Sequence, residues 1–298
     1  MLIHLKLLRF LLFVLIAVPI SRSFALPDGT TVYSNIPYGV NERQVMDIYS
    51  PSAQSQDAPV IFMVHGGAWR IGDKASKTVV KNKVDHWVSK GFVFISINYR
   101  LIPNAYPVEQ AEDVKKALRF AQQNLGKWGG SPESIVMMGH SAGAHLVSLI
   151  AATPDATLAP WLGTIALDTA AYDVDKIMNA NPRRLYKKAF GKEAEYWAEA
   201  SPTLVINQKI RPFLAVCSSK RKDGSCEEAG RFTEKANTLG ARAKLLPVNL
   251  SHRNINKKLG KNNCYTQSID DFLISLSPNI GQLLANKSRR KEKKCSGA

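Results

Sequence analysis

The most informative segment of this chain is Ser134-Ile135-Val136-Met137-Met138-Gly139-His140-Ser141-Ala142-Gly143. Its first half is a short apolar segment typical of a β-strand, and residues 144–152 that follow it are typical of a helix. A serine between a strand and a helix, with a glycine two positions away on each side, predicts a nucleophile elbow. The glycines are needed because this sharp turn brings backbone atoms too close together for a Cβ atom.

Apolar and helical segments alternate on both sides of this turn. We expect strands at residues 31–36, 43–49, 60–64, 93–98, 135–138, 164–167, 213–217 and 243–248, and helices at 78–90, 107–124, 142–152, 227–239 and 266–276. The first two strands look like an antiparallel pair, and the alternation predicts a mostly parallel sheet flanked by helices. Eight strands with the serine turn after the fifth are the layout of the α/β-hydrolase fold.

Residues 181–201 interrupt the alternation between the sixth and seventh expected strands. This small insertion carries several arginines and aromatic residues. It is either a lid or wall over the substrate site or a packed excursion on the surface.

The amino terminus predicts export. Lys6 and Arg9 precede the apolar run 10–18, and a small-residue exit follows at 23–25. This is the pattern of a secretory signal peptide over residues 1–25, which predicts a secreted or periplasmic protein. An uncleaved membrane anchor is the alternative, although the run is shorter than the roughly 20 residues of a typical span. The hydrolase domain is then expected at 26–284.

The chain is strongly basic, with a formal net charge of +16. Part of this charge lies in residues 285–298, which we expect to form a disordered basic tail. Such a tail can contact anionic surfaces, or it can simply be solvated. No aromatic residues are interleaved with its basic residues, so we expect no nucleic-acid binding. The sequence leaves the oligomeric state open.

Export would permit disulfides among the four cysteines. Cys217 and Cys226 are close in sequence, after an expected strand, and are the best candidate pair. Cys264 and Cys295 are expected either to pair or to stay free. We expect no metal site, because no group of cysteines and histidines has the paired spacing of metal ligands.

A serine nucleophile needs a base and donors for an oxyanion. His65-Gly66-Gly67-Ala68-Trp69 directly follows the third strand. In the α/β-hydrolase fold that loop and the residue after the nucleophile supply the donors, here the N–H groups of Gly66, Gly67 and Ala142. The base in this fold follows the last strand, and His252 is the only histidine beyond the helix of the serine.

The acid that orients this base is expected after the seventh strand. Asp223 is the only aspartate of that loop, and Asp223-Gly224 is a turn pair that could present its carboxylate. Glu227 and Glu228 are alternatives, although acidic residues there also suit the start of the next helix.

These segments resemble the α/β-hydrolase esterases of the hormone-sensitive-lipase and feruloyl-esterase-like (BD-FAE) type. The resemblance spans about residues 43–276 and rests on the 64–74 loop, 98–101, 112–114 and the serine turn. It implies a carboxylic ester hydrolase with Ser141, Asp223 and His252 as a triad and no cofactor. The chain departs from the family pattern at the acid, where Cys217-Ser218 stands in place of His-Gly.

The sequence therefore predicts an exported serine esterase that acts on a small-molecule ester through an acyl-enzyme. Two alternatives stay open. One is a catalytically silent binding protein with the hydrolase fold, tethered by its tail. The other is an amide hydrolase similar to kynurenine formamidases, which share the His-Gly-Gly-x-Trp turn.

Overall fold

The computed structural model describes residues 24–51, 56–153 and 155–285. Most of the expected signal peptide, the basic tail and Cys295 lie outside these ranges. Within them, eight strands form one sheet in the order β1-β2-β4-β3-β5-β6-β7-β8. The strands are β1 (Thr31–Pro37), β2 (Val45–Ser50), β3 (Ala58–Val64), β4 (Val93–Ile97), β5 (Gly130–His140), β6 (Gly163–Leu167), β7 (Phe213–Ser218) and β8 (Ala243–Val248).

The pairing confirms a mostly parallel sheet with an antiparallel opening. Strand β2 pairs antiparallel with β1 and with β4, and the six strands from β4 across to β8 are parallel. In the sheet register, Val64 lies opposite both Ile97 and Gly139. The carboxyl ends of the central strands therefore meet at one edge, where the serine turn lies.

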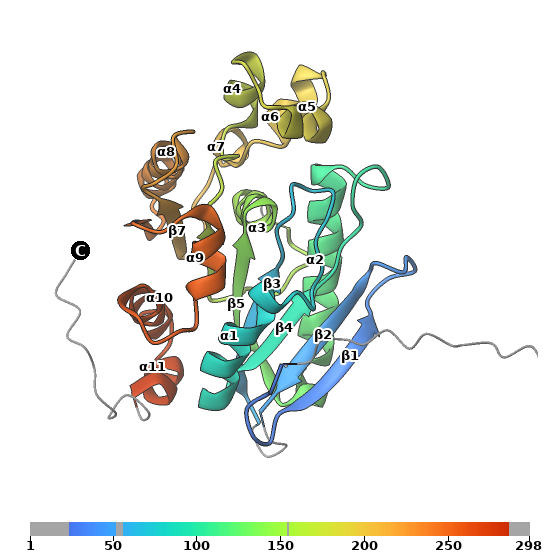
Figure 1. The fold of residues 1–298 in the computed structure, drawn as a ribbon, viewed down its shortest axis with the longest axis vertical. Coiled ribbons are helices and arrows are strands. Elements are labelled where there is room, and N and C mark those ends of the chain that lie inside the picture. The colour runs from blue at the N-terminus through green and yellow to red at the C-terminus, as the bar shows by residue number, and fades with distance from the viewer. Residues whose placement is uncertain (1–23, 52–55, 154, 286–298) are drawn as a thin grey trace, which may run out of the picture.

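Helices cover both faces of the sheet (Figure 1). Those outside the segment between β6 and β7 are α1 (Lys77–Trp87), α2 (Pro107–Asn124), α3 (Ala142–Ala152), α8 (Ser225–Thr238), α9 (His252–Lys258), α10 (Cys264–Ile274) and α11 (Pro278–Ala285), and 3-10 turns η1 (Val88–Lys90) and η2 (Leu125–Trp128) extend α1 and α2. None of the described helices is long and apolar enough to span a membrane.

Strands β3 and β4 are buried on both faces, as their largely apolar sequences predict. Every residue of β3 and β4 is buried. Because side chains alternate along a strand, Phe62 packs into the cluster that contains α2, whereas Ile61 and Met63 pack into the cluster that contains α1. This two-sided burial fixes the register that aligns the strand ends.

The segment between β6 and β7, which contains the expected insertion at 181–201, folds into four short helices: α4 (Val174–Asn179), α5 (Arg184–Phe190), α6 (Ala194–Glu199) and α7 (Pro202–Val205). They group at one end of the molecule, beyond α3 (Figure 1). The rings of Tyr186 and Phe190 on α5 lie 6.0 and 4.9 Å from that of Trp69, in the loop after β3. The insertion is thus packed against the loop that follows the third strand.

Candidate active site

Ser141 lies on the turn between β5 and α3 in a strained backbone conformation, with φ 56° and ψ −117°. A Cβ atom on Gly139 would lie 2.2 Å from the carbonyl oxygen of Gly143, and one on Gly143 would lie 2.3 Å from that of Val64. Only glycine fits these two positions, so the sequence pattern is explained by close backbone approach. The turn presents Ser141 at the carboxyl edge of the sheet.

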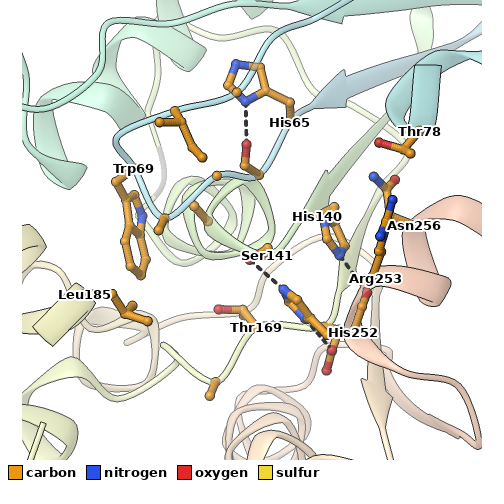
Figure 2. Close-up of a pocket in the computed structure, with 18 of the residues that line it drawn as sticks. His65, Trp69, Thr78, His140, Ser141, Thr169, Leu185, His252, Arg253 and Asn256 are labelled. Atoms are coloured by element: carbon orange, nitrogen blue, oxygen red, sulfur yellow. Dashed lines mark hydrogen bonds and ion pairs between the residues drawn. The ribbon is translucent and has the colours of Figure 1, made fainter. Parts of the chain in front are cut away.

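His252 is the first residue of α9, directly after β8, and its ring reaches the serine. Its Nε2 lies 2.9 Å from Ser141 Oγ, as Figure 2 shows. The main chain of His252 is held as well, because its carbonyl oxygen accepts a hydrogen bond from His140 Nε2 at 3.0 Å. Burial, together with the neighbouring His252, lowers the pKa of His140 to about 3, so His140 stays neutral and donates.

The carboxylate beside His252 belongs to Asp168, the residue directly after β6. Asp168 Oδ2 lies 2.6 Å from His252 Nδ1, and Oδ1 accepts a hydrogen bond from the Ser218 N–H at 2.9 Å. Its side chain is fully buried. Burial alone would raise the pKa of Asp168, but the hydrogen bond from His252 and the charge of Arg221 outweigh it, and the pKa is lowered. The ionised carboxylate can therefore hold the imidazole through Nδ1–H.

This geometry corrects the expected position of the acid. Asp223 does not reach His252, because both of its oxygens pair with Arg221, at 2.8 Å to Nε and 2.6 Å to Nη2. The remaining guanidinium nitrogen, Arg221 Nη1, lies 3.2 Å from Asp168 Oδ2 and 3.2 Å from His252 Nδ1. A guanidinium cannot accept a proton, so the imidazole N–H points to Asp168.

The two alternative acids also lie elsewhere. Glu227 pairs with Arg231 at 2.9 Å. Glu228 pairs with Arg231 at 2.6 Å and with Lys176 at 3.0 Å. Both belong to the first turn of α8, where acidic residues suit the helix dipole.

The expected disulfide between Cys217 and Cys226 is confirmed. Its Cα atoms are 5.0 Å apart. The bridge closes the loop that carries Arg221 and Asp223 and so restricts the position of the guanidinium beside Asp168. Cys264 is also disulfide-bonded.

The expected oxyanion donors surround the serine. Gly66 and Gly67 follow β3, and a Cβ atom on Gly66 would lie 2.9 Å from Ser141 Cβ. Gly67 has φ +136°, a backbone conformation that favours glycine. Ala142 is the first residue of α3, so its N–H has no acceptor four residues earlier in the helix. The structure brings these three residues together at Ser141.

His145 and His65 serve the packing around the site. His145 is buried, accepts a hydrogen bond from Trp69 Nε1 at 3.2 Å and donates to the carbonyl oxygen of Ala200 at 2.8 Å. His65 is also buried, and its ring contacts the Gly66 carbonyl oxygen and stacks on Tyr99. These contacts fix the loop that carries the two glycines.

A cavity of about 660 Å³ opens onto Ser141 and His252. Trp69 and Leu185 lie on one side of the serine, and Thr78, Arg253 and Asn256 on the other (Figure 2). Leu185 belongs to α5, as does Tyr186, which also lines the cavity. The insertion therefore forms one wall of this cavity.

Lys83 of α1 holds α9, the helix that begins with His252. It is 1% exposed, and its Nζ donates to the carbonyl oxygen of Asn256 at 2.9 Å, to Asn256 Oδ1 at 2.8 Å and to the Thr78 carbonyl oxygen at 3.3 Å. These acceptors are neutral, and burial lowers the pKa of Lys83 to about 7.

From the lowered pKa of Lys83 we predict how the unfolding free energy changes with pH. An unfolded lysine, with a pKa near about 10.4, binds more protons than folded Lys83 above pH 7, so this residue should make stability rise with pH from 7 upward. We expect the unfolding free energy of the wild type, relative to Lys83→Met, to rise by about 2 kcal/mol from pH 7 to pH 9. Urea denaturation at both pH values measures it, with exposed Lys77→Met of the same helix as control. An equal difference in unfolding free energy between wild type and Lys83→Met at the two pH values would contradict this prediction.

A protein-family model matches the sequence of this chain. The BD-FAE model covers residues 46–229, which hold the serine turn, the glycine loop and Asp168. The chain belongs to the BD-FAE family. His252, the partner of the serine, lies beyond the matched residues.

Among curated proteins, the chain is similar to the esterase LipQ of Mycobacterium tuberculosis, with 30% identity over 63% of this chain and 48% of LipQ. It is also similar to the isoprenylcysteine alpha-carbonyl methylesterase ICME of Arabidopsis thaliana, with 26% identity over 72% of this chain and 55% of ICME. The chain thus spans about half the length of the curated relatives it matches.

Solved structures show the same fold. A truncated carbohydrate esterase from gut microbiota superposes with a TM-score of 0.71 at 20% identity, over 85% of this chain and 98% of that chain. Esterase 2 of Thermogutta terrifontis superposes with a TM-score of 0.68 at 21% identity, over 88% of this chain and 95% of that chain. The BD-FAE chain therefore has the α/β-hydrolase fold.

Proposed function

We propose that this BD-FAE protein is a serine esterase in which Ser141 is the nucleophile, His252 the base and Asp168 the acid. The observation that carries the proposal is the continuous hydrogen-bonded chain from Ser141 Oγ through His252 to Asp168 at the base of the cavity. The named activities of LipQ and ICME support ester substrates. No cofactor is needed for this chemistry.

The reaction follows from the geometry in two halves. Ser141 Oγ attacks the ester carbonyl carbon while His252 Nε2 takes the serine proton, and the N–H groups of Gly66, Gly67 and Ala142 donate hydrogen bonds to the oxyanion. The carbon–oxygen bond to the alcohol then breaks, and His252 gives the proton to the leaving oxygen. Water, deprotonated by His252, then attacks the acyl carbon. The bond from this carbon to Ser141 Oγ breaks, His252 returns the proton to Oγ, and the carboxylic acid is released.

Two further features belong to this proposal. Asp168 fixes the tautomer of His252 with Nδ1–H directed away from the serine, so Nε2 is free to accept a proton.

We also propose that the protein is secreted or periplasmic. The basic and apolar pattern of residues 1–25 supports this, and so does the Cys217–Cys226 disulfide, a bond that persists in oxidising compartments.

A fluorophosphonate probe tests the nucleophile directly. We expect the mature protein to hydrolyse short 4-nitrophenyl esters and to lose this activity as the probe labels Ser141, identified by mass spectrometry of the labelled peptide. Ser141→Ala should take no label, which separates the elbow serine from other hydroxyl groups. A folded wild-type protein that stays unlabelled and inactive would overturn the proposal in favour of the silent binding protein.

A further inference from the structure

The wall that α5 contributes to the cavity is strongly basic. Residues 183–192 contain five lysines or arginines and no acidic residue. Arg183 precedes α5 and lines the cavity, and its side chain is 66% exposed. This wall thus presents positive charge to a ligand that binds beside Ser141.

Basic side chains reach the same cavity from two other elements. Lys222 belongs to the disulfide-closed loop and Arg253 to α9, and both residues are exposed and line the cavity. Arg183, Lys222 and Arg253 are far apart in the sequence. Because three separate elements each contribute one cation, the positive charge is a property of the cavity rather than of a single charged segment.

The basic patch continues onto the rim. Arg70 lies between Trp69 and Ile71, which both line the cavity. The charge of Arg184, followed by that of Arg70, lowers the pKa of Lys188 on α5. Arg70 from the loop after β3 and the basic residues of α5 are therefore near enough to repel one another. Such repulsion is what a bound anion would relieve.

Three acids, Asp73, Asp168 and Asp223, also line the cavity and offset part of this charge. Asp168 is buried, and Asp223 pairs with Arg221 at 2.6 Å and lies 3.7 Å from Arg183. Asp73 accepts hydrogen bonds from Asn98 Nδ2 and from the Ala75 N–H, and it forms no ion pair with Arg183, Lys222 or Arg253.

Five other cations of the cavity and its rim form no ion pair with any described residue. They are Arg70, Arg184, Lys188, Lys222 and Arg253. Unpaired cations around a partly enclosed cavity raise the local concentration of anionic ligands and hold them electrostatically.

We propose that the cavity takes esters that carry an anionic group, and that Arg183, Lys222 and Arg253 hold this group while the ester carbonyl lies at Ser141. The proposal rests on the esterase function proposed above and names its substrate class. The apolar side chains of Trp69 and Leu185 line the same cavity and can contact the uncharged part of the substrate. A carboxylate and a phosphate share the chemistry that these cations recognise.

Matched ester pairs test this substrate class. On the acyl side, the mono-4-nitrophenyl ester of glutaric acid is compared with its neutral methyl ester. On the alcohol side, 4-acetoxybenzoate is compared with methyl 4-acetoxybenzoate. At low salt we expect kcat/KM to favour the charged member of at least one pair by about tenfold, and this preference to shrink in 0.5 M NaCl because salt screens charges at the cavity mouth. The pair that responds identifies the side of the ester that carries the anion.

Variants connect the preference to the named residues. The triple variant Arg183→Gln, Lys222→Gln and Arg253→Gln should lower the ratio of charged to neutral kcat/KM by about tenfold. Lys244→Gln, an exposed lysine on β8, removes a charge away from the cavity and should leave the ratio unchanged. A wild type that hydrolyses the neutral esters but shows no charge preference, or a ratio that the triple variant leaves unchanged, overturns this inference alone. Absence of both ester hydrolysis and probe labelling overturns the esterase function and this inference with it.

Discussion

Replacing either Ser141 or His252 with alanine should lower kcat for a short 4-nitrophenyl ester by about 10⁵- to 10⁶-fold, and replacing both should lower it no further. The reason is the 2.9 Å hydrogen bond between Ser141 Oγ and His252 Nε2. A serine without its base stays protonated, and a base without the serine has no nucleophile to activate. The two side chains therefore act as one unit, and their losses are not additive.

The measurement is kcat and KM of the two single variants and the double variant, each checked for folding by circular dichroism. The matched control is His86→Gln. His86 pairs with Asp270 at 2.7 Å, near the end of α1 opposite to Thr78 and Val79, which line the cavity, so this variant should keep its activity. A double variant that is slower than both single variants by a further large factor would show that Ser141 and His252 act independently, which the hydrogen bond does not allow.

The sheet could be predicted because its signals are local. Residues 60–64 are a continuous apolar run, residues 93–97 are apolar apart from Ser96, and both lie in fully buried strands in the structure. Strand β5 is longer than predicted, because Gly130 pairs with Ala58 across an irregularity in the register. The residues between this pair and Ile135 are polar, so hydrophobicity gives no sign of a strand there.

The insertion was harder to predict in detail. Helices α4 to α7 have four to seven residues each, too few for a clear apolar period. The sequence predicted only an irregular segment that was either a wall or a surface excursion. What decides between these two is the contact of Tyr186 and Phe190 with Trp69, which lies more than 100 positions away in the sequence.

The carboxylate that contacts His252 was not the predicted one, for a topological reason. The sheet order puts β6 between β5 and β7, so the carboxyl ends of both β6 and β7 lie near the serine turn. The Asp168 N–H even donates to the carbonyl oxygen of Val216 on β7. Sequence alone does not say which of two neighbouring strands supplies the carboxylate. The available signal was a single aspartate directly after an apolar strand, together with Arg221 in the loop where the acid was expected.

Replacing Asp168 with asparagine should therefore lower kcat by about 10⁴-fold, whereas the same change at Asp223 should lower it by at most about tenfold. An asparagine at 168 can turn its NH₂ group toward His252 Nδ1, which would favour the tautomer with the proton on Nε2 and leave no acceptor for the serine proton. It also removes the charge that stabilises the imidazolium formed during reaction. Asp223→Asn leaves the 2.6 Å contact between Asp168 and His252 in place and weakens only the pairing of Arg221.

The comparison of these two variants distinguishes the geometry from the family pattern. Glu227→Gln serves as the control, because Glu227 pairs with Arg231 on the surface of α8 and should leave kcat unchanged. If Asp223→Asn lost as much activity as Asp168→Asn, the acid would have to come from the disulfide loop, and Arg221 could not occupy its observed place beside His252. If only Asp168→Asn is inactive, the loop after β7 keeps a positioning role: its arginine holds the acid that β6 supplies.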